Sequence, residues 1–262
     1  MGRRKIGLAL GSGGAKGFAH VGVLKALEEH HVPVDFVSGS SMGSLVGAFY
    51  ATGMRPDFMD RLARTLTWRH WVDVTVPRVG LISGKRIHDV IALLTKGADF
   101  QQANLPLAIV ATELLTGSSV TFTTGRIADA VRASISIPGV FVPYVRDDGV
   151  FVDGGVMERV PVEAVKELGA DVVIAVDVAT VMKREVPATM MDVIMLSLDA
   201  MMGQLLQHKL PTADVFITPD LSDIGTSQFG RAGEAIEIGY RATLAAMADI
   251  LKLVDEADES FT

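Results

Sequence analysis

Apolar residues recur along the 262 residues of this chain with two different spacings. Short, nearly continuous apolar runs, which predict strands, occupy residues 5–10, 34–37, 105–111, 119–123, 151–152, 172–178 and 214–218. Segments with an apolar residue every three or four positions, which predict helices, occupy residues 18–30, 42–52, 127–133, 162–168, 190–208 and 232–254. Strands and helices largely alternate, so we expect an α/β fold with a mainly parallel central sheet and helices on both faces.

The chain has no internal repeat and no linker, so we expect residues 1–262 to form a single domain. Its least regular segment, residues 55–85, carries both tryptophans and several basic residues. We interpret this segment as a cap or lid over the functional site. The last residues, 255–262, are acidic, and we expect them to fray.

Composition and charge narrow the functional classes. The formal net charge is -7, whereas a nucleic-acid binder should carry a positive field, so we expect no nucleic-acid partner. The chain has no cysteine, which excludes disulfides, thiolate metal ligands and a cysteine nucleophile. The apolar run at residues 6–10 is too short for a signal peptide, and no run is long enough to span a bilayer. We therefore expect a cytoplasmic protein.

A serine stands between the second predicted strand and the helix that follows it. The pattern Gly39-x-Ser41-x-Gly43 is that of a nucleophile elbow, in which a sharp turn lifts a serine hydroxyl above the edge of the sheet. The start of the next helix also favours negative charge near this serine. We therefore predict that Ser41 is a nucleophile.

A glycine-rich loop follows the first predicted strand and opens a helix. Residues Gly11 to Gly17 include Lys16, and such a loop lets several backbone N–H groups converge on one anion. The order Ala-Lys-Gly does not fit a phosphate-binding Walker loop, but G-x-G-x-x-x-G is a loose form of a dinucleotide-binding fingerprint. In a serine hydrolase the anion would be the oxyanion of the tetrahedral intermediate, and the predicted donors are the amides of Gly13, Gly14, Ala15 and Met42.

The proton acceptor that a serine nucleophile needs is predicted at Asp153. This aspartate ends a short apolar run and precedes Gly154 and Gly155, which allow a tight turn behind it. Burial would raise its pKa and make it a better base near neutral pH. A triad of Ser41 with His208 is the alternative, and the remaining histidines, His20 among them, are expected to be surface or capping residues.

Together these segments resemble the patatin-like phospholipase family over nearly the whole chain. The resemblance is carried by IGLALGSGGAKGFAHVGVLKAL, GSSMGS, the Asp-Gly-Gly segment, ADVVIAVDV and ADVFITPDLSD. It implies a three-layer α/β/α sandwich and a dyad of Ser41 and Asp153 that uses no histidine. It also implies an oxyanion hole in residues 12–17, and hydrolysis of acyl esters of phospholipids or lysophospholipids without a metal or cofactor.

Two residues depart from the family pattern. Lys16 stands where the family usually carries arginine; it keeps the charge but loses the planar fork. Ser12 occupies the first position of the usual glycine run, which leaves the set of oxyanion donors open.

The expected ligand is a lipid ester, reached by transient contact with a membrane surface. Residues 55–71 mix arginine with apolar and aromatic residues, a composition suited to anionic headgroups, although a solvated helix with one buried face has the same composition. The helix at 190–208 carries a methionine-rich face that could adapt to acyl chains or to a second copy in a homodimer, or pack in the core; its methionines are Met190, Met191, Met195, Met201 and Met202.

Three other functions fit parts of this pattern. An acyltransferase would share the elbow but pass the acyl group to another acceptor. A nucleotide-binding oxidoreductase would use the glycine loop for its cofactor. A regulatory adaptor would keep the fold without catalysis.

Overall fold

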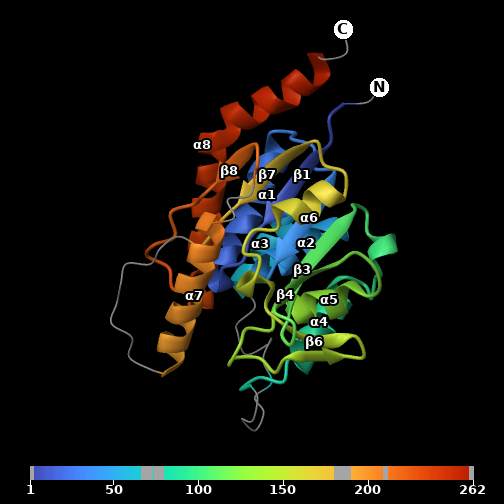
Figure 1. Ribbon diagram of the computed structural model, residues 1–262. Coiled ribbons are helices and arrows are strands. Elements are labelled where there is room, and N and C mark those ends of the chain that lie inside the picture. The colour runs from blue at the N-terminus through green and yellow to red at the C-terminus, as the bar shows by residue number, and fades with distance from the viewer. Residues whose placement is uncertain (1–2, 66–72, 74–79, 180–189, 209–211, 260–262) are drawn as a thin grey trace.

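The computed structural model describes residues 3–65, 73, 80–179, 190–208 and 212–259. Its centre is an eight-stranded sheet (Figure 1). Consecutive members of the series β5-β6-β3-β2-β1-β7-β8 are hydrogen-bonded to each other, and β4 also pairs with β3. Strands β1, β2, β3, β7 and β8 run parallel, while β4 and β6 lie antiparallel to β3, and β5 lies antiparallel to β6. The strands are β1 (Ile6–Leu10), β2 (Phe36–Ser40), β3 (Leu107–Glu113), β4 (Ser118–Phe122), β5 (Tyr144–Arg146), β6 (Gly149–Val152), β7 (Val172–Val176) and β8 (Val215–Ile217).

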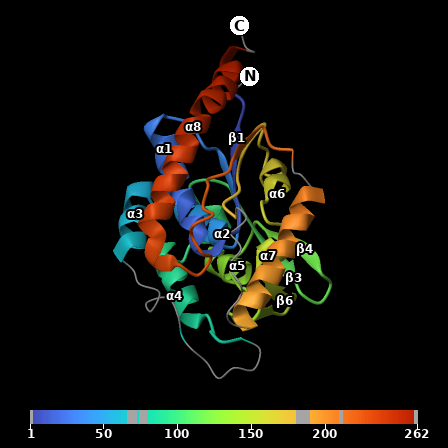
Figure 2. The same cartoon turned by 90° about the vertical axis from the view of Figure 1, so that its left-hand side faces the viewer.

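Helices cover both faces of this sheet. The α-helices are α1 (Ala19–Glu29), α2 (Met42–Ala51), α3 (Pro56–Thr65), α4 (Lys85–Leu94), α5 (Ile127–Ser134), α6 (Val162–Glu167), α7 (Met190–His208) and α8 (Ala232–Glu259). Short 3-10 turns are η1 (Gly14–Phe18), η3 (Phe100–Gln102), η4 (Gly154–Val156) and η5 (Phe229–Arg231). Figure 2 shows α1, α3 and α8 on one side of β1 and α6 and α7 on the other. The expected three-layer α/β/α sandwich with a mainly parallel sheet is therefore confirmed.

The alternation of side chains along β1 explains the two layers, because successive residues of a strand point to opposite faces. Ile6, Leu8 and Leu10 belong to the large core cluster that includes residues of α1, α2 and α8. Ala9 belongs to a smaller cluster with valines of α6 and β7. Every residue of β1 is buried, so the strand reads as a continuous apolar run.

Strand β3 brings two distant parts of the chain to one point. Its residues Val110 and Thr112 both pair with β4, so their partners in β2 and β6 must lie along the opposite edge. Along that edge β2 runs parallel and ends with Ser40 opposite Val110, while β6 runs antiparallel and ends with Val152 opposite Thr112. The residues that follow these two strands, 41 and 153, therefore meet.

The observed elements differ from the expected ones in a few places. Strand β2 reaches Ser40, because Ser38 and Gly39 still pair with β1 and the Ser38 hydroxyl donates to the Pro161 carbonyl. Strand β5 and helices α3 and α4 have no counterpart among the expected elements.

Part of the expected cap segment is now placed. Residues 56–65 form α3, which packs against α1 and α8 and begins with Pro56, a residue favoured in the first helical turn. Trp68 and Trp71 lie outside the described residues. Among the helices that the structure describes, none combines the length and apolar character needed to cross a membrane.

Candidate active site

The turn between β2 and α2 holds Ser41 in a backbone conformation that non-glycine residues rarely adopt. Its φ is 53° and its ψ is -124°, and such strain persists only where the surroundings enforce it. Enforcement comes from close backbone contacts at Gly39 and Gly43: a Cβ on Gly43 would lie 2.1 Å from the Leu10 carbonyl oxygen, and one on Gly39 would lie 2.5 Å from the Gly43 carbonyl oxygen. The elbow therefore needs both glycines.

The Ser41 hydroxyl donates to Asp153 Oδ2 over 2.6 Å. Both residues are buried, each 5% exposed. The second carboxylate oxygen, Oδ1, accepts from the Gly155 amide at 2.8 Å. The backbone of Asp153 is fixed as well, because its N–H donates to the Ser136 carbonyl and its carbonyl accepts from the Thr112 hydroxyl. Each carboxylate oxygen of Asp153 thus has a defined partner, and Oδ2 is oriented to take the proton of the Ser41 hydroxyl.

Burial raises the pKa of Asp153 from 3.8 to about 6. Removal from water favours the neutral carboxyl, while the hydrogen bonds from Ser41 and Gly155 favour the ionised form and offset part of that effect. Asp199, a nearby negative charge, raises the pKa further. The result is a carboxylate that is ionised at neutral pH yet far more basic than an exposed aspartate, which suits a general base.

The glycine loop lies against the same pocket. Among the described residues no acceptor takes the amides of Gly13, Gly14 or Met42, whereas the Ala15 amide donates to the Thr226 carbonyl at 2.8 Å. The expectation that Ala15 supplies an oxyanion donor is therefore wrong for this conformation. Gly13 and Gly14 line the pocket together with Ser41 and Asp153, and Met42 starts α2 directly after Ser41.

His20 has a role that the sequence did not predict. It is fully buried, and its Nε2 lies 2.7 Å from the Gly11 carbonyl oxygen, so it holds the start of the glycine loop. Burial lowers its pKa to about 4, which makes the ring neutral with Nε2–H as donor. The expectation of a surface or capping histidine is wrong. The helical spacing of 20, 23, 24 and 27, all buried, was the signal that placed it on the inner face.

Several charged side chains lie close to the glycine loop. Lys16 is 1% exposed, and its pKa is lowered by burial although the Asp199 carboxylate partly offsets this. Asp199, on α7, lines the pocket with Ser41 and Asp153, and burial raises its pKa too. Arg159 pairs with Asp177 at 2.8 Å. Asp199 is the charged residue of the pocket lining that the sequence did not predict, because a lone aspartate in a helix carries no motif.

The pocket itself measures about 520 Å³ including its open mouth. Apolar residues complete its lining, among them Ile137, Leu198 and Met202. Of the methionines on α7, Met202 therefore faces the pocket and Met201 is exposed, while the side chains of Met190, Met191 and Met195 lie outside the described residues. The same holds for the side chain of His208, so the alternative triad is not placed; the Ser41 hydroxyl already has Asp153 as its partner.

Comparison with solved structures agrees with this architecture. VipD from Legionella pneumophila superposes with a TM-score of 0.55 at 14% identity, covering 97% of this chain and 67% of that one. The type III effector protein ExoU superposes with a TM-score of 0.55 at 16% identity, covering 97% of this chain and 54% of that one. At these identities the likeness shows the fold alone.

Curated relatives match more closely in sequence. An uncharacterized NTE family protein of Mycobacterium bovis is 38% identical over 175 residues, 66% of this chain and 48% of the relative. Lysophospholipase NTE1 of Pyricularia oryzae is 28% identical over 97% of this chain and 19% of the relative, and lysophospholipase nte1 of Aspergillus fumigatus is 35% identical over 68% of this chain and 12% of the relative. The chain thus spans about half of the mycobacterial relative and a fifth or less of the fungal ones.

A family model decides the classification. The model of the patatin-like phospholipases matches residues 8–166, which contain the glycine loop, the elbow serine and the Asp-Gly-Gly segment. This stretch is more than half of the chain. It includes β2, β3 and β6, the strands whose pairing brings Ser41 and Asp153 together. This chain belongs to the patatin-like phospholipase family.

Proposed function

We propose that this chain is a serine acyl hydrolase that cleaves carboxylic ester bonds of phospholipids or lysophospholipids through Ser41 and Asp153. One observation carries the proposal: a strained, buried serine donates over 2.6 Å to a buried carboxylate. The pKa of that carboxylate is raised to about 6. A nucleophile joined to a base in one pocket is the arrangement that covalent catalysis requires.

The first half of the reaction transfers the acyl group to the protein. Asp153 takes the proton of the Ser41 hydroxyl as Oγ attacks the ester carbonyl carbon. The carbonyl oxygen becomes an oxyanion, and the amides of Gly13, Gly14 and Met42 donate to it; a single well-placed donor of this kind contributes ~3–4 kcal/mol of barrier reduction. The intermediate collapses, the carbon–oxygen bond to the alcohol breaks, and Asp153 returns the proton to the departing alcohol oxygen.

The second half restores the serine. Asp153 takes a proton from water, and the resulting hydroxide oxygen attacks the acyl carbon. The same amides hold the second oxyanion. Its collapse releases the fatty acid, and Ser41 Oγ recovers the proton from Asp153. The protein thus supplies a nucleophile, one proton carrier and fixed dipoles.

The lipid substrate class rests on the family and on relatives named lysophospholipases. The acyltransferase alternative uses the same first half and differs only in the acceptor of the acyl group. The oxidoreductase alternative is disfavoured because Gly13 and Gly14, whose amides have no acceptor among the described residues, line the pocket of Ser41. The cytoplasmic location, membrane contact and homodimer stay predictions.

The test compares Ser41→Ala with Ser40→Ala on p-nitrophenyl butyrate and on a panel of phospholipids and lysophospholipids. Ser40 is the neighbouring buried serine, and its hydroxyl has no partner among the described residues, so its removal leaves the dyad intact. We expect Ser41→Ala to lose all ester cleavage and Ser40→Ala to keep most of it.

Product analysis separates hydrolysis from transfer. Release of free fatty acid in the presence of added lysolipid supports a hydrolase, and formation of diacyl product supports an acyltransferase. Full activity in folded Ser41→Ala would refute the proposal.

A further inference from the structure

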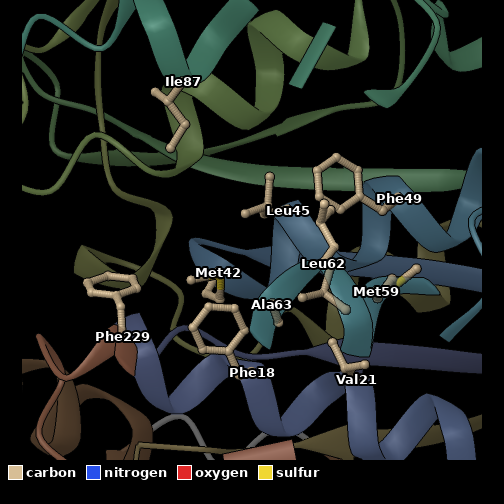
Figure 3. Close-up of a pocket in the computed structure, with 11 residues that line it drawn as sticks. Phe18, Val21, Met42, Leu45, Phe49, Met59, Leu62, Ala63, Ile87 and Phe229 are labelled. Carbon is tan, nitrogen blue, oxygen red and sulfur yellow. The ribbon is translucent and has the colours of Figure 1, made fainter. Parts of the chain in front are cut away.

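A second pocket lies beside the catalytic one and differs from it in character. It measures about 580 Å³ including its open mouth, and every described residue that lines it has an apolar side chain. These side chains come mainly from α2 and α3, with others from α1, α4 and the η turns, and Figure 3 shows them pointing into a common space. A pocket of this kind cannot satisfy the hydrogen bonds of a headgroup or a phosphate, so burying either group there would be unfavourable.

Three short segments of the chain each contribute residues to both pockets. Ser41 lines the catalytic pocket, and Met42 lines the apolar one. In the same way Gly14 and Phe18, both in η1, lie on opposite sides. Thr226 and Phe229 repeat the relationship, with Thr226 on the catalytic side. The linings of the two pockets are therefore continuous along the chain at the nucleophile, where Ser41 and Met42 are consecutive residues.

Met42 and Gly17 lie in contact at this junction. The Met42 side chain lies against Gly17 so closely that a Cβ on Gly17 would be 2.4 Å from Met42 Cγ. Methionine is unbranched and changes rotamer easily, and Gly17 offers no side chain that would block its path. Beyond Met42, the rings of Phe18 and Phe229 meet edge to face with centroids 6.2 Å apart and continue the apolar surface.

We propose that the apolar pocket binds the fatty acyl chain of the ester whose carbonyl carbon lies at Ser41, with the chain passing the Met42 side chain. The inference rests on the proposed function and adds to it the part of the protein that selects the acyl chain. Its occupant follows from two observations: the residue directly after the nucleophile, Met42, lines the pocket, and every described residue of the lining is apolar. The length of the acyl chain that the protein accepts is then limited by the space between α2 and α3.

Ala63 on α3 lines the pocket with the smallest side chain of the set, so Ala63→Phe should shorten it. We expect turnover of p-nitrophenyl butyrate to change less than about twofold. Turnover of p-nitrophenyl laurate should fall at least about tenfold, the effect of excluding a few methylene groups from an apolar site. Ala248→Phe, an exposed position of α8, is the matched control and should leave the ratio of the two rates unchanged. Ala63→Leu, with a smaller side chain, covers the case in which Ala63→Phe does not fold.

A binding measurement separates this inference from the proposed function. Ser41→Ala, which cannot turn over ester, should bind the fluorescent fatty acid cis-parinaric acid, and the double variant with Ala63→Phe should bind it at least about tenfold more weakly. If wild-type protein cleaves no ester but this difference persists, the proposed function fails and the acyl pocket stands. If folded Ala63→Phe and Ala63→Leu keep the wild-type laurate-to-butyrate ratio and fatty-acid affinity, the acyl pocket is refuted.

Discussion

The catalytic pocket, lined by Ser41, and the apolar pocket, lined by the next residue Met42, are built in different ways. In the catalytic pocket, fixed backbone contacts and hydrogen bonds hold each group: Ser41 is strained, and both oxygens of Asp153 have donors. In the apolar pocket only packing positions the side chains. Backbone strain and a buried charge are found in the catalytic pocket, where a fixed proton acceptor is required. Adaptable side chains line the apolar pocket, where a flexible ligand would enter.

The largest effect on activity is expected for Asp153→Asn, which removes the base of the catalytic pocket. Hydrolysis of a short aryl ester should fall by about 10²–10⁴-fold, the usual contribution of a positioned base. The folded-state pKa of Asp153, about 6, lies above the value of 3.8 for an unperturbed aspartate. Ionisation therefore costs the folded state free energy, and wild-type stability is lost as pH rises from about 4 through 6.

Asparagine removes this cost, so the variant should be more stable than wild type at pH 7.5 by on the order of 1–3 kcal/mol. The gain should disappear near pH 3, which lies below the pKa of Asp153 in the unfolded as well as the folded state. Urea unfolding at the two pH values measures it, with the exposed Asp148→Asn as control. A variant that is both inactive and less stable at pH 7.5 would show that the carboxylate is held for structure.

The second test concerns the strained elbow. A Cβ on Gly43 would lie 2.1 Å from the Leu10 carbonyl oxygen, a backbone atom that cannot move alone. We expect Gly43→Ala to lower the free energy of unfolding by about 1–3 kcal/mol and to remove most esterase activity.

Gly47, one turn further along α2, is the matched control. Its Cβ would lie 3.0 Å from a methyl group of Val37, and alanine favours a helix by up to about 1 kcal/mol. Gly47→Ala should therefore be nearly neutral in stability and activity. Equal tolerance of both substitutions in urea unfolding would contradict the strained elbow.

The smallest expected effect is electrostatic. Asp199 raises the pKa of Asp153, and activity requires the ionised base, so it should increase as pH rises through that pKa. Asp199→Asn should shift the acidic limb of kcat/KM to lower pH by less than about one unit. A pH–rate profile measures the shift, and a limb that moves to higher pH would contradict this sign.

Sequence patterns predict some of these features and not others. The elbow at Ser41 and the strand ending at Asp153 carry local motifs, so their chemistry could be predicted one segment at a time. Their meeting depends on β2 and β6 sharing one edge of β3 from opposite directions, and the reversal of β6 leaves no periodic signal.

Residues whose role comes from tertiary neighbours were missed. His20 matters through the Gly11 carbonyl, and Asp199 through a pocket formed by segments far away in the sequence. Ala15 fails as a donor because Thr226, more than two hundred residues later, accepts its amide hydrogen. Helix α3 was hidden in an irregular segment, although its apolar side chains line the second pocket.

One measurement bears most directly on the dyad: the rate at which a fluorophosphonate probe labels the wild-type protein, followed against pH and mapped by mass spectrometry. We predict a single label on Ser41, with a rate that rises through an apparent pKa near 6 and falls by at least about a hundredfold in Asp153→Asn. Labelling of Ser41 at an undiminished rate in folded Asp153→Asn, or labelling at another residue, would contradict the account.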